Sequence, residues 1–139
     1  MLGMFIHVYM SPVVETAHAE IVIEEPPKVV MIEVVYTEED IIRKIREAFP
    51  ETPETAVAIA KCESGLDVDI QSHHTLSYGR EQSFGLFQIH APAWDKKAHA
   101  LGYTKYRTDV EDNIAMARYI YEQSGKRWTA WSCYTKKMI

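Results

Sequence analysis

One glutamate stands where the sequence suits proton transfer. Glu63 follows an apolar helical run and precedes Gly65 by two residues, and glycine commonly ends helices. The partial negative charge of a helix C-terminus and apolar neighbours both disfavour an ionised carboxylate. A carboxyl group that stays protonated can act as a general acid, which cleavage of a glycosidic bond requires. Taken alone, however, the pattern favours an ordinary solvated glutamate at a helix end.

A second segment carries one polar side chain among apolar ones. Residues 85–89 read GLFQI, a glycine followed by apolar residues and a single glutamine. This pattern predicts a short buried strand or turn, from which Gln88 could present its amide to a cleft. By itself the segment is better explained as part of a core.

The chain has two cysteines, which are too few for a four-ligand zinc site of their own. Cys62 therefore has Cys133 as its one partner within the sequence. An oxidising compartment favours a disulfide between them, whereas the cytosol favours two buried free thiols. A disulfide would join the last turn of the chain to the helix that carries Glu63. No cofactor is expected, and the histidines have no spacing typical of a metal site.

Four motifs in this order resemble the lysozyme-like superfamily. They are residues 62–65 (CESG), 85–89 (GLFQI), 113–119 (NIAMARY) and 128–133 (WTAWSC). The resemblance extends over about residues 40–134. It is strongest to lytic transglycosylase domains of the soluble-lytic type and to the transglycosylase-like domains of resuscitation-promoting factors.

The resemblance implies cleavage of peptidoglycan between N-acetylmuramic acid and N-acetylglucosamine. Glu63 would protonate the leaving oxygen and then serve as the base, while the acetamido group of the substrate stabilises the sugar cation. The muramyl 6-hydroxyl would then close on the anomeric carbon and leave a 1,6-anhydromuramyl end. The residues that the resemblance implies at the substrate are Ser64, Ser83, Gly85, Leu86, Phe87, Gln88, Asn113 and Tyr119.

The second carboxylate separates two mechanisms, because a two-acid glycosidase needs a partner within about 5–9.5 Å of the first. Animal-type lysozymes have an aspartate two residues before the glycine of the GLFQI-like segment, and this chain has Ser83 there. Glu81 could replace it only if the loop bends suitably. The sequence therefore favours a transglycosylase with Glu63 alone. A lysozyme-type hydrolase using Glu63 and Glu81, and a non-catalytic wall-binding module, remain as alternatives.

The elements that must position these residues are mainly helical. We expect a small lysozyme-like domain over residues 37–139, of the mainly α (α+β) class, with a short irregular or hairpin insert at about 66–91. Caps, prolines and apolar spacing predict its helices. They begin near Thr37, Thr52, Pro92 and Thr108, and an aromatic turn at 128–134 closes the domain.

The residues before this domain differ in kind. Residues 1–19 are predicted to be a signal peptide, with an apolar stretch and an Ala-His-Ala site but no preceding Lys or Arg. Residues 20–36 are predicted to be an acidic extended tether, interrupted by two prolines and with an edge strand at 29–35. We therefore expect a secreted, periplasmic or wall-associated protein. A phage virion subunit is the alternative, since the signal is imperfect.

Composition excludes several classes. The 139 residues include 15 Lys and Arg against 20 Asp and Glu, a net charge of −5, which argues against a nucleic-acid partner. No uncharged apolar run is long enough for a stable membrane span. Residues 1–40 carry eight acids and one base, whereas residues 41–139 carry twelve acids and fourteen bases. The predicted catalytic domain is thus slightly basic, and we expect it to be a monomer.

Overall fold

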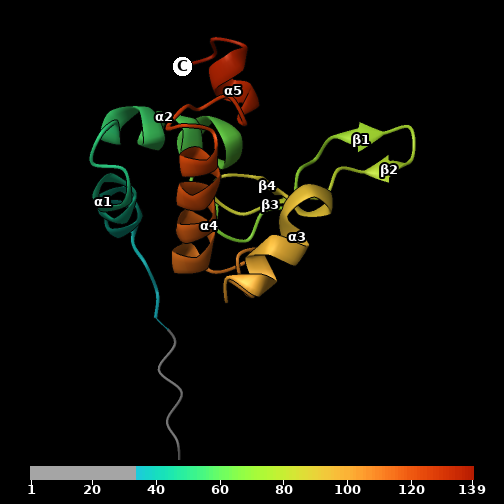
Figure 1. The fold of residues 1–139 in the computed structure, drawn as a ribbon, viewed down its shortest axis with the longest axis horizontal. Coiled ribbons are helices and arrows are strands. Elements are labelled where there is room, and N and C mark those ends of the chain that lie inside the picture. Colours follow the sequence, from blue (N-terminus) through green and yellow to red (C-terminus); the bar gives the residue numbers. More distant parts are fainter. Residues whose placement is uncertain (1–33) are drawn as a thin grey trace, which may run out of the picture. The chain divides into compact units, whose positions relative to one another are not determined.

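A computed structural model describes residues 34–139 (Figure 1). The predicted signal peptide and residues 20–33 of the predicted tether lie outside this range. Val34 and Val35, the described end of the strand predicted at 29–35, have no strand structure. Within residues 34–139, no helix is both long enough and apolar enough to cross a membrane.

The described residues form a mainly α domain, as the sequence predicts, and its first two helices begin and end at recognisable signals. Helix α1 spans Glu38–Ala48, and Thr37 and Asp40 form a capping box at its start. Helix α2 spans Pro53–Ser64, with proline in its first turn, and ends at Gly65 with φ 67°. The end of α2 is therefore fixed at the residue that follows Glu63 and Ser64.

Helix α4 lies at the centre of the domain. It spans Val110–Gln123 and packs against α1, while α3 (Ala91–Ala100) lies on its other side (Figure 1). The predicted cap of α4 was Thr108, but the residue that caps it is Asp109, whose side chain accepts the backbone N–H of Asp112. Threonine and aspartate are both good N-caps, and the backbone geometry of this turn selects Asp109.

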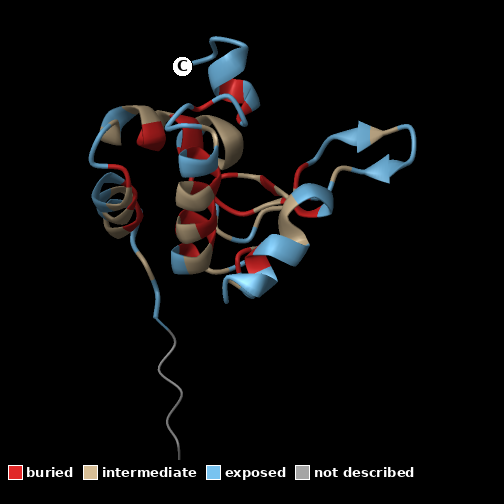
Figure 2. Ribbon diagram, in the orientation of Figure 1, coloured by how far each residue is buried: buried red, intermediate tan, exposed pale blue. Residues whose placement is uncertain are grey.

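The insert between α2 and α3 contains two small antiparallel strand pairs. Strand β1 (Thr75–Leu76) pairs with β2 (Gly79–Arg80), and β3 (Ser83–Phe84) pairs with β4 (Ile89–His90). The β1–β2 hairpin extends away from the helices and is largely exposed (Figure 2). Strands β3 and β4 lie against the core, and the turn between them holds the predicted GLFQI segment.

An aromatic cluster fills the core behind this turn. Phe87 stacks with Trp128 and packs edge-on against Trp131, with ring centroids 6.3 and 6.0 Å apart. Phe49 of the α1–α2 connection lies 4.8 Å from Trp128. Trp131 directly precedes the last helix, α5 (Ser132–Thr135), and its indole N–H donates to the carbonyl of Phe87 at 2.9 Å. The C-terminal turn is thereby attached to the β3–β4 turn.

A fully buried asparagine fixes the β3–β4 turn to α4. The Asn113 amide oxygen accepts the Phe87 N–H at 2.9 Å, and its Nδ2 donates to the carbonyls of Tyr106 and Phe84 at 2.6 and 3.1 Å. Gly85 lies so close that a Cβ atom there would be 2.4 Å from Nδ2 of Asn113. Its φ of +72° is also one that glycine adopts readily. The turn can therefore take this form only with glycine at this position.

Candidate active site

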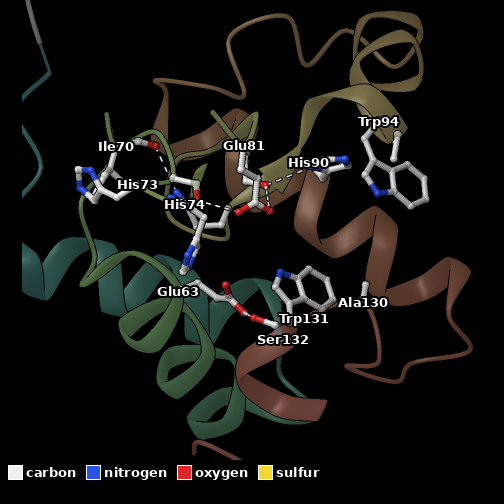
Figure 3. A pocket seen from close by; sticks show the side chains of 14 residues that line it. Glu63, Ile70, His73, His74, Glu81, His90, Trp94, Ala130, Trp131 and Ser132 are labelled. Atoms are coloured by element: carbon white, nitrogen blue, oxygen red, sulfur yellow. Dashed lines mark hydrogen bonds between the residues drawn. The ribbon is translucent and has the colours of Figure 1, made fainter. Parts of the chain in front are cut away.

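A pocket of about 580 Å³ opens where the end of α2, the insert, the start of α3 and the segment before α5 meet (Figure 3). We call it the Glu63 pocket. Its lining combines carboxylates, imidazoles, hydroxyls and two indoles. The lining residues are Glu63, Ile70, Ser72, His73, His74, Glu81, Ser83, Gln88, His90, Ala93, Trp94, Ala130, Trp131 and Ser132.

Glu63 is half-buried and is held from one side. Its Oε1 accepts the backbone N–H of Cys133 at 3.0 Å and the hydroxyl of Ser132 at 3.4 Å. Its Oε2 has no hydrogen-bond partner among residues 34–139 and points into the pocket (Figure 3). Oε2 is therefore the atom that can carry a proton for transfer to a bound molecule.

Of the two alternatives for the cysteines, a disulfide or two free thiols, the structure has the disulfide. Cys62 and Cys133 are bonded across 71 residues of chain. Because Cys62 precedes Glu63 and Cys133 donates to it, the covalent bond and the hydrogen bond act at neighbouring backbone positions. The C-terminal turn and the candidate acid are thus fixed to each other twice.

Gln88 reaches the pocket from the β3–β4 turn. Its backbone has φ 45°, a left-handed conformation that is uncommon for a residue with a side chain. Its Nε2 donates to the carbonyls of Ile70 and Gly85 at 3.2 and 3.0 Å. Both amide protons are therefore engaged, and the amide oxygen has no protein partner within the described residues. Strain of this kind is typical of functional sites, and the free oxygen can accept a donor from a ligand.

Several of the residues predicted at the substrate have buried side chains. Leu86, Phe87 and Asn113 are fully buried, and Gly85 is buried beside them. The Ser64 hydroxyl donates to the Leu86 carbonyl at 2.8 Å, which ties the end of α2 to the β3–β4 turn. These residues support the pocket wall from behind, so any part they take in binding is through the backbone and through the position of Gln88.

Tyr119, also predicted at the substrate, lies behind an indole that lines the pocket. Its ring packs edge-on against Trp94 with centroids 6.3 Å apart, and Tyr119 is not among the lining residues. Trp94 is held in turn through its neighbour Asp95. The hydrogen bonds that Asp95 accepts from Arg107 at 2.8 Å and Tyr106 at 3.0 Å keep the pKa of its carboxyl below the ordinary value. Trp94 is therefore the aromatic side chain that α3 offers to the pocket.

The insert supplies residues that the motifs do not reveal. Ser72, His73 and His74 line the pocket although they follow no recognisable pattern in the sequence. Glu81, whose place depended on how the loop bends, also lines it. The bend comes from the β1–β2 hairpin, which returns the chain to the pocket wall at Glu81. Within residues 34–139, no three His, Cys, Asp or Glu side chains are grouped so as to hold a metal ion.

Comparison with known families decides the affiliation of the chain. A family model of the transglycosylase SLT domain matches residues 40–135. The chain belongs to this family. Neither a curated protein nor a solved structure matches it. The matched span runs from the first turn of α1 to the end of α5, so every residue of the Glu63 pocket belongs to the SLT domain.

SLT domains are lytic transglycosylase-type domains that act on peptidoglycan, usually outside the cytoplasm. The disulfide beside Glu63 fits such a location, because oxidising compartments favour disulfides. The predicted signal peptide and most of the tether precede the SLT domain and fall outside both the match and the described residues.

Proposed function

We propose that this SLT domain cleaves the bond between N-acetylmuramic acid and N-acetylglucosamine and leaves 1,6-anhydromuramyl ends. The observation that carries the proposal is the state of Glu63 in its pocket. One carboxyl oxygen is fixed by the Cys133 N–H, and the other is free to hold a proton. A single positioned acid with a free oxygen is what a transglycosylase requires.

In the proposed reaction Glu63 passes one proton out and takes one back. Oε2 protonates the glycosidic oxygen while the bond from that oxygen to the muramyl C1 breaks. The acetamido oxygen of the same sugar forms a bond to C1 and spreads the positive charge. The muramyl 6-hydroxyl then attacks C1, the bond from the acetamido oxygen breaks, and the hydroxyl proton moves to the Glu63 carboxylate. The free Gln88 amide oxygen and the Trp94 ring are candidates for holding the sugar in this geometry.

The test is a product analysis of digested peptidoglycan by mass spectrometry. We expect the protein to release fragments with anhydromuramyl ends, and Glu63→Gln to abolish their release while leaving the melting temperature unchanged. Glu39→Gln is the matched control, since it removes an exposed carboxylate of α1 far along the chain from the pocket residues. Cleavage that survives in Glu63→Gln would contradict the assignment of the acid.

A second candidate function is a lysozyme-type hydrolase that uses Glu63 and Glu81. It is favoured by one observation, which is that both carboxylates line the same pocket. Hydrolysis adds water across the bond, so the products would carry reducing ends in place of anhydro ends. A third outcome, in which the protein is retained by peptidoglycan without cutting it, would indicate a wall-binding module.

We further propose that residues 1–19 direct export and that residues 20–36 act as an acidic tether before a monomeric catalytic domain. The disulfide supports an oxidising destination. For a cellular protein this is the periplasm, the cell wall or the medium, and the alternative is a phage virion. Detection of a mature N-terminus after Ala19 in the exported protein would support the first part. An intact N-terminus on the active protein would argue for the virion alternative.

A further inference from the structure

Glu81 is the second carboxylate of the Glu63 pocket, and two serines hold it there. Its Oε2 accepts the Ser72 hydroxyl at 2.9 Å, and its Oε1 accepts the Ser83 hydroxyl at 3.1 Å. Both serines are nearly inaccessible to solvent, with exposed fractions of 7% and 4%. The Glu81 side chain is thus anchored at both oxygens by hydroxyls that have little competition from water.

The direction of the surrounding hydrogen bonds makes Glu81 an acceptor. The His74 N–H donates to the Ser72 hydroxyl oxygen at 3.2 Å, and the Ser72 hydroxyl in turn donates a hydrogen bond to Glu81. The Ser83 hydroxyl has a single hydrogen and donates it in the hydrogen bond to Glu81. In the 3.4 Å contact with Nδ1 of His90 the Ser83 oxygen must therefore be the acceptor, and Nδ1 must carry the hydrogen. Donors therefore converge on Glu81 from both sides.

An ionised carboxylate has about four acceptor positions, and the serines use two of them. Glu81 therefore keeps two acceptor positions for a bound molecule, and its side chain lines the pocket across from Glu63 (Figure 3). The other nearby acids do not compete for this place. Asp67 and Asp69 are exposed and are not among the lining residues, and Asp67 accepts the N–H of Asp69 in the loop itself.

We propose that Glu81 accepts the N–H of the acetamido group on the muramyl sugar and so orients the acetamido oxygen toward C1. The inference rests on the proposed function, because that acetamido group is the internal nucleophile in the reaction given above. A carboxylate on the N–H draws the proton toward itself and makes the carbonyl oxygen more electron-rich. As C1 becomes cationic and the charge passes to the acetamido group, the contact strengthens, so it favours the transition state over the ground state.

The same arrangement explains how the chain manages with Ser83 where an animal-type lysozyme has an aspartate. Ser83 does not replace the carboxylate. It donates to a carboxylate that arrives from two residues earlier in the chain. Glu81 is consequently placed for the substrate amide while Glu63 keeps the proton-transfer role.

The test compares two enzymes on two substrates. Glu81→Gln keeps the shape of the side chain, and an amide can still bond both serine hydroxyls, so the fold should be retained. The substrates are peptidoglycan strands with N-acetylated or with de-N-acetylated muramyl residues. On the acetylated strands we expect Glu81→Gln to lower kcat on the order of 10²-fold and to change KM less than threefold. On the de-N-acetylated strands we expect both enzymes to be equally slow.

This substrate-dependent loss is the decisive readout, because a merely structural role for Glu81 would lower the rate on both substrates by the same factor. Equal losses on the two substrates, or a Glu81→Gln rate within threefold of wild type on acetylated strands, would overturn the proposal. Glu39→Gln is the matched control and should follow wild type on both. Should Glu81→Gln fail to fold, Glu81→Asp, which withdraws the charge by one methylene, is expected to show the same selective loss.

Failure of the proposed function remains distinguishable from failure of this inference. Glu63→Gln should be inactive on both substrates. If it cleaves either one, the proposed acid is wrong whatever Glu81 does. If it is inactive and Glu81→Gln is fully active, Glu63 stands and the role of Glu81 is refuted.

Discussion

The backbone N–H of Cys133 donates to Oε1 of Glu63 at 3.0 Å, and Cys133 is also bonded covalently to the residue before Glu63. One residue of the C-terminal turn thus holds the candidate acid through its main chain and anchors that main chain through its sulfur. The hydrogen bond is directional, whereas the disulfide limits how far α5 can move from α2. Together they leave Oε2 as the carboxyl oxygen without a hydrogen-bond partner among the described residues.

The disulfide is expected to matter for stability and for activity. In the double variant Cys62→Ser, Cys133→Ser, loss of a link across 71 residues should lower the free energy of unfolding. The loop-entropy model gives about 4 kcal/mol for a loop of this length. Cleavage of peptidoglycan should also be slower than in wild type at temperatures where the variant is still folded, because α5 can then move the Cys133 N–H away from Glu63. Urea unfolding and a cleavage assay, with and without a thiol reductant, measure both effects.

The thiol reductant provides the control for this experiment. It should lower the stability and rate of wild type to those of the double variant and should leave the variant unchanged. Wild-type cleavage that is insensitive to full reduction would show that the disulfide does not hold Glu63 in place.

Gly85 is expected to tolerate no side chain. An added Cβ would lie 2.4 Å from Nδ2 of Asn113 and 3.3 Å from the Tyr106 carbonyl oxygen, in addition to the strain of φ +72°. Gly125→Ala is the matched control, since its φ is +68° and its nearest neighbour, Arg127, is 4.0 Å away. Gly85→Ala should be the more destabilising of the two by about 1–3 kcal/mol, the usual range for overpacking. Equal midpoints in urea would refute the close approach.

Asn113 is expected to hold the β3–β4 turn in place. Asn113→Ala leaves the Phe87 N–H and the carbonyls of Phe84 and Tyr106 without their partner. An unsatisfied buried polar group costs about 1–3 kcal/mol, so a loss of about 3 kcal/mol or more in unfolding free energy is expected. The exposed Gln123 of the same helix gives the control Gln123→Ala, which should change stability by less than about 0.5 kcal/mol.

The free energy of unfolding is expected to fall at acid pH, because carboxylates in ion pairs outside the pocket become protonated. Hydrogen bonds from Arg118 and then Lys126 keep the pKa of Glu51 well below its ordinary value. Hydrogen bonds from Thr37 and Arg43 lower the pKa of Asp40 to about 2. Since the folded pKa is the lower one, each group stabilises the fold above its unfolded pKa, and this stabilisation is lost as pH falls toward the folded value.

Glu51→Gln tests this sign. The variant should be less stable than wild type at pH 7, and the gap should close as pH falls below about 4, where the unfolded carboxyl becomes protonated. Thermal melts from pH 7 to pH 2 follow the gap. A gap that stays constant over this range would mean that Glu51 acts through packing and not through its charge.

Much of the fold follows from local signals. The caps, prolines and glycines that begin and end α1 and α2 lie within a few residues of the positions that they define, so the sequence reveals them. The cap of α4 was misplaced by one residue, because Thr108 and Asp109 are both good caps and only the geometry selects Asp109.

The site was less predictable, and for a physical reason. In the GLFQI segment alternation shows that some side chains face the core, but it does not say which, and the positive φ of Gln88 turns that side chain to the pocket. Glu81 lies eighteen positions after Glu63 in the sequence and reaches the pocket only because the β1–β2 hairpin returns the chain to it. Such long-range placement leaves no periodic signal.

The disulfide also has a topological consequence. All the residues that line the Glu63 pocket fall between Cys62 and Cys133, so the pocket is built entirely within a covalent ring. A single protease cut in the exposed β1–β2 hairpin, at Tyr78 for instance, opens the ring but releases none of its members. A nicked chain would still carry its pocket on one covalent molecule, and only a reductant would then separate Glu63 from Glu81.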